Sequence, residues 1–373
     1  MKTTRFGPAI AALIVTIFAF GCSPCRSAAE PPPVPKDVKA NAKAMMERGT
    51  TWLVAQQNDN GSFHADEHME PAVTALAVRA MATGPLRDEL MKTDGFKKAV
   101  AFILSCVQDD GGVYIDDWAA NYHTSVAFSA LAALEDPKLR PTIDKIQAYV
   151  KGAQADEGEG LSPGDPDYGS FGYRKGQRKG DMSNLQMALI SLKDSGLSSD
   201  DAAWGKALKF VERCQNITAD GGFIYRPGES KAGEDPDAPE GETRYRSYHN
   251  MTYIGLLSMI YGSVDKDDER VVKAVGWLKK HWSFDENHPL GLQGLYYGYH
   301  TLSRAFAAYG EKTITDADGV EHDWYAELVE ALATRQHTDG YWVNTDKRWF
   351  ETDKTLVTTY CLLALAHPYK QYK

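Results

Sequence analysis

The chain has 373 residues, of which 43% are hydrophobic and 25% are charged, and this balance excludes a mainly disordered protein. Its 41 Lys and Arg residues against 51 Asp and Glu residues give a net charge of −10, which argues against a nucleic-acid-binding protein. Five Cys residues are too few for a chain of this length to be held together by disulfides.

The N-terminal segment has the pattern of an export signal. Lys2 and Arg5 precede an apolar run, residues 9–20, which is too short to span a bilayer as a helix but fits the core of a secretory signal. We therefore expect residues 1–29 to be a signal peptide, and the protein to be exported to the periplasm or the cell surface.

Two cleavage sites are compatible with this signal. The run ends at Gly21-Cys22, which resembles the lipobox of bacterial lipoproteins, although Ala19 stands where a larger aliphatic residue is usual. The alternative is ordinary cleavage after Ala29, which also follows small residues. We expect contact with a membrane only through a lipid anchor at Cys22.

The rest of the chain is expected to form one domain. Residues 30–36 are rich in Pro and predict a stiff, extended linker. Residues 37–373 contain no second linker and repeat one theme, which predicts a single domain of six repeats.

A short turn motif marks the repeats. The pattern Gln-x3-Gly-x-aromatic occurs three times, and two longer variants follow Gln154 and Gln215; the three strict copies are Gln57–Phe63, Gln108–Tyr114 and Gln336–Trp342. Glycine allows the tight backbone that ends a helix, glutamine can bond the free backbone groups there, and the aromatic ring can pack over the helix end.

Helical periodicity surrounds each motif. The segments before the motifs have apolar residues at three- and four-residue steps, which predicts amphipathic helices at 44–55, 96–106, 143–154, 203–214, 271–280 and 324–335. The segments after them are rich in Ala and Leu and nearly uncharged, which predicts buried helices at 72–82, 124–134, 185–192, 251–261, 297–309 and 356–366. An all-α fold follows, in which an amphipathic outer ring surrounds an apolar inner ring.

The motif on paired helices of this period resembles the repeat of the squalene cyclase and protein prenyltransferase β-subunit superfamily. The resemblance implies an α/α toroid of six helical hairpins around a central cavity, the terpenoid cyclase fold. The chain has room for one such toroid, whereas triterpene cyclases that resemble it carry two.

The catalytic motifs of that superfamily do not transfer to this chain. Class II cyclases use an Asp of a DxDD motif; here the match, Asp265–Asp268, falls on a loop rich in charge, where we expect a solvated helix start. Prenyltransferases hold zinc with Asp, Cys and His, but Cys361 has no matching Asp and the nearest His is His367, so we interpret Cys361 as a core residue. No metal or other cofactor is expected.

Three predicted inner helices begin with a Tyr-His pair, and acids stand at the corresponding place in other repeats. If the ring closes, these ends meet at one mouth, and His, Asp and Tyr together can carry out acid–base chemistry. The candidate catalytic residues are therefore Tyr122, His123, Tyr248, His249, His300, Asp117 and Asp181. Alternatively, each His only caps a helix or lines a wet rim.

Long insertions on the same side supply candidate ligand-binding residues, since loops of this length in a repeat fold are commonly functional. Arg can hold a carboxylate or a phosphate with two hydrogen bonds, or can offset the acids of its own loop. The candidates are Tyr168, Tyr173, Arg174, Arg244, Arg246, Tyr299 and Asp353.

Three functions remain open. The first is an enzyme or binder for an apolar, isoprenoid-like ligand; the second is an exported polysaccharide lyase or hydrolase; the third is a non-catalytic binding module at the cell surface. The expected partner is an apolar small molecule or a carbohydrate in the central cavity, and no nucleic acid. A dry aromatic cavity favours the first function, and a polar groove with paired carboxylates favours the second.

Overall fold

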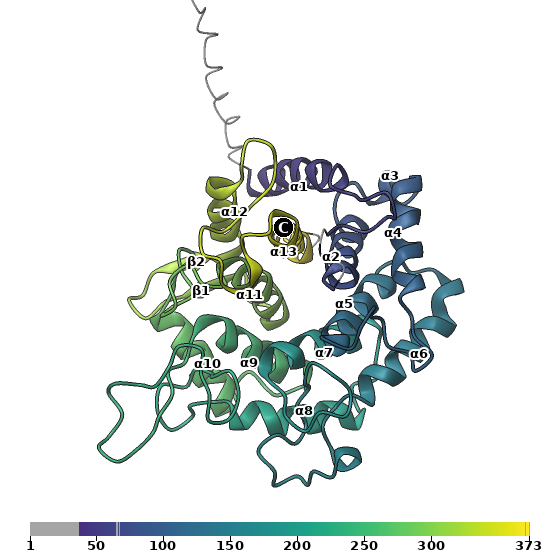
Figure 1. Ribbon diagram of the computed structural model, residues 1–373. Coiled ribbons are helices and arrows are strands. Elements are labelled where there is room, and N and C mark those ends of the chain that lie inside the picture. Colours follow the sequence, from purple (N-terminus) through teal and green to yellow (C-terminus); the bar gives the residue numbers. More distant parts are fainter. Residues whose placement is uncertain (1–36, 65, 67, 370, 373) are drawn as a thin grey trace, which may run out of the picture. The chain divides into compact units, whose positions relative to one another are not determined.

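The computed structural model describes residues 37–373 apart from 65, 67, 370 and 373. The predicted signal peptide, Cys22 and the Pro-rich linker therefore lie outside the described residues. Twelve helices form two concentric rings (Figure 1). The outer helices are α1 (Val38–Val54), α4 (Asp94–Ser105), α6 (Arg140–Lys151), α8 (Ala202–Arg213), α10 (Glu269–Lys280) and α12 (Trp324–Arg335). The inner helices are α2 (Glu70–Thr83), α5 (Ala120–Ala132), α7 (Met182–Asp194), α9 (His249–Tyr261), α11 (Leu295–Tyr309) and α13 (Lys354–Tyr369).

The inner helices follow one another around the ring. Each packs against the next in chain order, and α13 packs against both α1 and α2, which brings the last repeat back to the first. Every predicted helix is present, and the fold is the expected α/α toroid. Within the described residues, no helix combines the length and the apolar character that crossing a bilayer requires.

The two rings differ in burial as their sequences predict. Outer helix α8 buries one stripe, with Trp204, Ala207 and Val211 at three- and four-residue steps, and Asp201 caps its first turn. Inner helix α9 buries every residue except Ile260. A helix that is apolar on all sides is stable only when it is surrounded, so the sequence alone assigns the helices to the two rings.

The turn glutamines connect neighbouring repeats. Gln336 donates from Nε2 to the carbonyl oxygen of Gly340 at 2.8 Å and to that of Met45, on α1, at 3.0 Å. Gln57 and Gln215 make the same pair of bonds to their own turns and to the start of the next outer helix. These three glutamines therefore tie their turns to the following repeat, and Gln336 ties the last repeat to the first.

In the second repeat the motif is shifted by one residue from the predicted alignment. The glycine with positive φ is Gly111, at 92°, and Val113 takes the place of the aromatic residue. The Gln108 side chain donates to the carbonyl oxygens of Cys106 and Tyr114 within its own turn, and the link to the next outer helix comes instead from Lys145, which donates to the Gln108 backbone carbonyl at 3.1 Å. The sequence motif is present in this repeat, but the backbone turn is offset from it by one residue.

In four repeats a threonine on the inner helix accepts a hydrogen bond from the turn. The backbone N–H two residues after the turn glycine donates to a Thr hydroxyl oxygen at 2.8–3.1 Å, the acceptors being Thr74, Thr124, Thr252 and Thr358. This bond gives a common reference position on four inner helices. The short helix α3 (Arg87–Leu90) lies outside the rings. So does a hairpin of β1 (Thr313–Thr315) and β2 (Glu321–Asp323), in which Ile314 pairs with His322.

Candidate functional site

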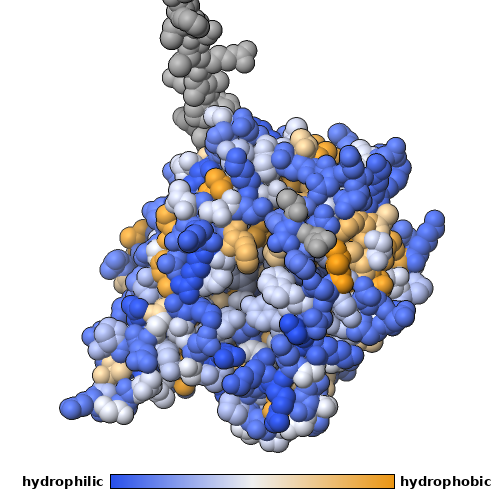
Figure 2. Space-filling model, viewed as in Figure 1, coloured by the Kyte–Doolittle hydropathy of each residue, from blue (hydrophilic) through white to orange (hydrophobic). Residues whose placement is uncertain are grey.

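A cavity of about 520 Å³ lies where the N-terminal ends of the inner helices meet. We call it the aromatic cavity, because six tyrosines line it together with two tryptophans and a phenylalanine: Tyr122, Tyr173, Tyr225, Tyr248, Tyr297, Tyr360, Trp118, Trp349 and Phe350. Its polar lining comes from His123, Arg174, Gln177, Ser183, Asn184, Lys231 and Asn250. The space-filling view along the ring shows a hollow near its centre (Figure 2). None of the described lining residues carries a carboxylate.

The tyrosines inside the cavity are neutral donors. The hydroxyl oxygens of Tyr122 and Tyr360 lie 3.1 Å apart, and the Tyr297 hydroxyl donates to the side-chain oxygen of Gln186. Burial raises the pKa of Tyr122 to about 12, so this phenol keeps its proton at neutral pH. The cavity wall is therefore uncharged and aromatic at this depth.

His123 is also a neutral wall residue. Only 1% of its surface is exposed, and neither ring nitrogen has a hydrogen-bond partner among the described residues. Burial lowers the pKa of His123 to about 4, so the imidazole is uncharged at neutral pH. One ring nitrogen can donate and the other can accept, which makes His123 a free polar contact for a ligand.

The mouth of the cavity is more polar and partly strained. Arg174 lies 3.4 Å from Asp117, and Lys231 pairs with Glu229 and lies 4.0 Å from the centroid of the Tyr225 ring. Trp349 and Phe350 have φ angles of 55° and 63°, a backbone region that side chains other than glycine rarely adopt. Exposed aromatic rings thus border the opening, held there by a backbone of higher energy.

The three Tyr-His pairs do not converge as expected. Tyr122, His123 and Tyr248 line the aromatic cavity, but His249 points to the outer ring. Its Nε2 lies 2.7 Å from the carbonyl oxygen of His281, and its Nδ1 accepts from the backbone N–H of His288 at 2.9 Å. Both ring nitrogens therefore hold the loop after α10, and His249 is corrected to a structural residue.

His300 and Tyr299 lie deeper than the sequence suggested. Helix α11 begins at Leu295, so the pair sits more than one turn inside the helix instead of at its entrance. The Tyr299 hydroxyl donates to the carbonyl oxygen of Phe284, and His300 lines a different cavity at the other end of the ring. Neither residue reaches the lining of the aromatic cavity.

The candidate acids cap helices or pair near the mouth. Asp181 caps α7, accepting from the backbone N–H groups of Ser183 and Asn184 at 2.9 Å each. Burial raises its pKa, and hydrogen bonds from Asn184, Tyr225 and Ser183 oppose that change. Asp353 begins α13 and lies 3.2 Å from His64, while Asp117 is exposed.

Three candidate ligand-binding residues hold their own loops. Arg244 bonds Asp235 at 2.6 Å, and Arg246 donates to the carbonyl oxygen of Ala232. The Tyr168 hydroxyl donates to Glu157 at 2.7 Å. Among the long insertions, only Tyr173 and Arg174 of the proposed set reach the aromatic cavity.

Sequence reasoning missed Tyr225, Tyr297, Tyr360, Asn184 and Asn250. The common threonine was the available signal, because Tyr122 and Asn250 both stand two residues before it and both line the cavity. Counting from the threonine, instead of searching for equal residue pairs, would have selected Asn250 over His249.

The two motifs set aside in the sequence are structural. Asp268 caps α10 at the surface and pairs with Arg270 at 2.7 Å, so the DxDD match is a helix start. Cys361 is fully buried on α13. Among the described residues, no group of three or more His, Cys, Asp or Glu side chains is arranged to hold a metal ion.

The sequence matches the prenyltransferase alpha-alpha toroid domain over residues 38–162 and 119–235, which together span more than half of the chain. The chain belongs to this family. Its toroid is complete in the structure, because the six helix pairs continue beyond the matched residues to α13. No curated protein matches the sequence.

Solved structures share the fold at low sequence identity. The type II terpene cyclase MstE from Scytonema, in complex with merosterolic acid A, superposes with a TM-score of 0.54 at 14% identity, covering 90% of this chain and 99% of that one. The GH76A α-1,6-mannanase from Salegentibacter gives 0.56 at 11% identity, covering 88% and 98%. The GH76 α-mannanase BT2949 from Bacteroides thetaiotaomicron gives 0.56 at 10%, covering 90% and 99%. These toroids therefore include proteins named for terpenoid and for carbohydrate chemistry.

Proposed function

We propose that the aromatic cavity binds a small, largely apolar molecule of isoprenoid-like character. The observation that carries the proposal is a cavity of about 520 Å³ lined by six tyrosines, with no carboxylate among its described lining residues. Its volume falls in the range of small-molecule sites, and aromatic walls supply most of the contact area such ligands need.

The polar groups give the ligand an orientation. Arg174 and Lys231 lie at the mouth, whereas His123 and the buried tyrosines lie inside and are uncharged. Each of these two cations already pairs with a carboxylate, Asp117 or Glu229. A ligand with an apolar body and one polar end fits this distribution, with the polar end toward the mouth. The proposal is for binding, because none of the described lining residues carries a carboxylic acid that could protonate an alkene.

A carbohydrate ligand is the second candidate. The toroid is shared with two mannanases, and Trp118 presents a partly exposed ring at the cavity edge, on which a sugar can stack. Hydrolysis of a glycosidic bond in most families uses two carboxylates about 5–10 Å apart. The described lining of the aromatic cavity holds none, so this candidate is weaker.

The test compares the two ligand classes on the same protein. Trp118 and Trp349 line the cavity, so their fluorescence is expected to change when geranylgeraniol is titrated in and to stay constant with mannotetraose. Replacing Ser183, which also lines the cavity, by Phe should fill space and weaken geranylgeraniol binding at least tenfold. Ser199→Phe, on the exposed loop after α7, is the matched control.

Equal binding by wild type and Ser183→Phe would place the ligand elsewhere and refute the proposal. A response to mannotetraose that Ser183→Phe removes would favour the carbohydrate candidate.

We further propose that the domain works outside the cytoplasm, carried there by the signal at residues 1–29. The measurement is the distribution of the full chain between cell fractions. Membrane association that Cys22→Ala abolishes would support the lipid anchor, and a soluble exported protein would favour cleavage after Ala29.

A further inference from the structure

A second cavity, of about 250 Å³, lies at the opposite end of the inner ring, where the C-terminal ends of the helices meet. We call it the arginine cavity. It is lined by Arg79, Thr83, Ser129, Ala132, Ala133, Glu135, Asp194, His300, Arg304, Leu363 and His367. The rings of His300 and Tyr360, 5.8 Å apart, lie between it and the aromatic cavity.

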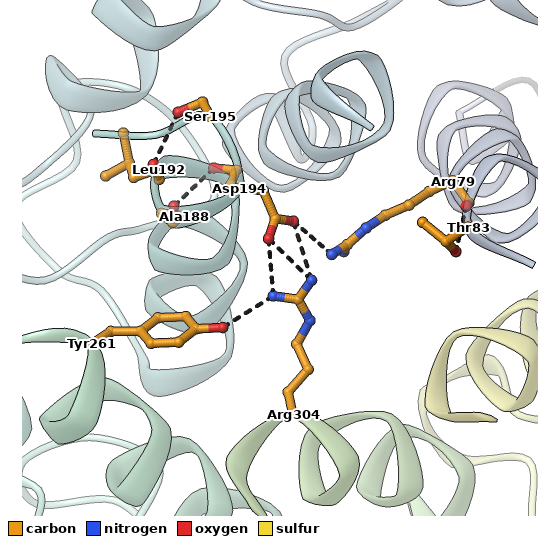
Figure 3. A network of polar contacts seen from close by, with 9 residues as sticks. Arg79, Thr83, Ala188, Leu192, Asp194, Ser195, Tyr261 and Arg304 are labelled. Carbon is orange, nitrogen blue, oxygen red and sulfur yellow. Dashed lines mark hydrogen bonds and ion pairs between the residues drawn. The ribbon is translucent and has the colours of Figure 1, made fainter. Parts of the chain in front are cut away.

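Two buried arginines in this cavity share one carboxylate. Arg79 and Arg304 are 6% and 4% exposed. Arg79 donates to Asp194 at 2.6 Å, and both terminal nitrogens of Arg304 reach Asp194 at 3.1–3.2 Å, as Figure 3 shows. The remaining bond of Arg304 goes to the hydroxyl of Tyr261, which is neutral. The cluster therefore carries an excess of one positive charge.

The other titratable groups around the cavity do not cancel this charge. Glu135 lies at the edge with a side chain that is 81% exposed, and it pairs with Arg87 at 3.3 Å. Burial lowers the pKa of His300 to about 3 and that of His367 to about 4, so both are neutral. Burial also raises the pKa of Asp194, and any protonation of this carboxyl would only increase the positive excess.

Polar groups in the cavity remain without partners. Within the described chain, Arg79 donates only to Asp194, which leaves its other N–H groups free. Both ring nitrogens of His300 are buried and make no hydrogen bond there. A buried charge without full compensation is costly, so an additional partner for these groups would stabilise the arrangement. The carbonyl ends of the inner helices offset part of the charge but make no hydrogen bond to Arg79.

We propose that the arginine cavity binds a small oxyanion, the carboxylate or phosphate group of a compact molecule, on Arg79 and Arg304 with His300 as an additional donor. Guanidinium groups match both anions in geometry, and the cavity has room for a molecule of few heavy atoms. This site is separate from the aromatic cavity and does not depend on what that cavity binds.

The test measures thermal unfolding of the full chain at pH 7.5 with succinate or inorganic phosphate, against chloride at equal ionic strength. At about 100 times its Kd, a bound anion should raise Tm by about 4 °C. Whichever of succinate and phosphate gives the larger shift identifies the anion class. Arg79→Met should remove the shift, whereas Arg335→Met, which breaks a distant ion pair with Asp285, should keep it.

Asp194→Asn keeps the proposal testable if Arg79→Met fails to fold. This change removes the carboxylate that the two arginines share, so the variant should be less stable than wild type and should gain more from the anion. Anion shifts no larger than those of chloride in both wild type and Asp194→Asn would overturn the proposal. Geranylgeraniol binding by Asp194→Asn tests the aromatic cavity separately.

Discussion

The histidine between the two cavities gives a quantitative prediction. His300 is 1% exposed, neither of its ring nitrogens has a hydrogen-bond partner in the described chain, and burial lowers its pKa to about 3. In the unfolded chain an ordinary His has a pKa of about 6.5. Between these values the unfolded state binds a proton that the folded state refuses, so this group destabilises the fold as the pH falls below 6.5.

The size of the effect follows from the linkage. With a pKa of about 6.5, the unfolded His300 is about one-tenth protonated at pH 7.5 and about nine-tenths protonated at pH 5.5. One pH unit below an unfolded pKa of about 6.5 corresponds to about 1.4 kcal/mol of lost stability. His300→Phe keeps an aromatic ring of similar size and cannot titrate, so its stability should fall by about 1.4 kcal/mol less than that of wild type over this range.

Urea unfolding in HEPES at pH 7.5 and in MES at pH 5.5, without multivalent anions, measures the difference. Other buried histidines titrate equally in both proteins and cancel. His64→Gln is the control of opposite sign. The hydrogen bond to Asp353 raises the pKa of His64, so protonated His64 stabilises the fold at low pH and this stabilisation is lost as the pH rises. Removing His64 should therefore increase the loss of stability in acid. Equal pH dependence in wild type and His300→Phe would refute the assignment of His300 as a buried neutral group.

Three further predictions concern the backbone and one carboxyl. Burial raises the pKa of Glu351 to about 7, so the folded state holds a proton that the unfolded state loses above about pH 4.5. The free energy of unfolding should therefore fall by about 3 kcal/mol between about pH 4.5 and 8. Glu351→Gln should flatten that change in urea unfolding. Gly340 has a φ of +104°, and an added Cβ would lie 2.6 Å from the carbonyl oxygen of Arg48. Gly340→Ala should therefore lower the free energy of unfolding by about 2 kcal/mol or more in the same assay. The same change at Gly276, an exposed glycine with no atom near its Cβ position, should not have this cost. Trp349→Gly should relieve about 1 kcal/mol of backbone strain but also lose the packing of a ring that is 36% exposed, so stability should stay level or fall. Geranylgeraniol binding should weaken, and tighter binding would contradict a role for Trp349 in the cavity wall.

Local sequence patterns were sufficient to predict the architecture. Apolar spacing separated the striped helix 203–214 from the uniformly apolar helix 251–261, and this difference assigns one to the outer ring and the other to the inner ring. The turn motif marked the helix pairs because its glycine and glutamine do the same backbone work in most repeats. In the second repeat, however, the glycine with positive φ is Gly111, which shows that the sequence motif and the backbone turn can be offset by one residue.

The direction of each site residue required the tertiary structure. His123 stands one residue before its reference threonine and His249 three before, and at about 100° per residue this places them on nearly opposite sides of their helices. His300 follows the start of α11 by five residues, about 7.5 Å along the axis, and so faces the other cavity. Arg79, Asp194 and Arg304 come from three helices far apart in the sequence, and only ring closure brings them together. Sequence periodicity fixes which helices are buried, but the packing of each helix start sets its rotation and depth, and these decide which side chains share a cavity.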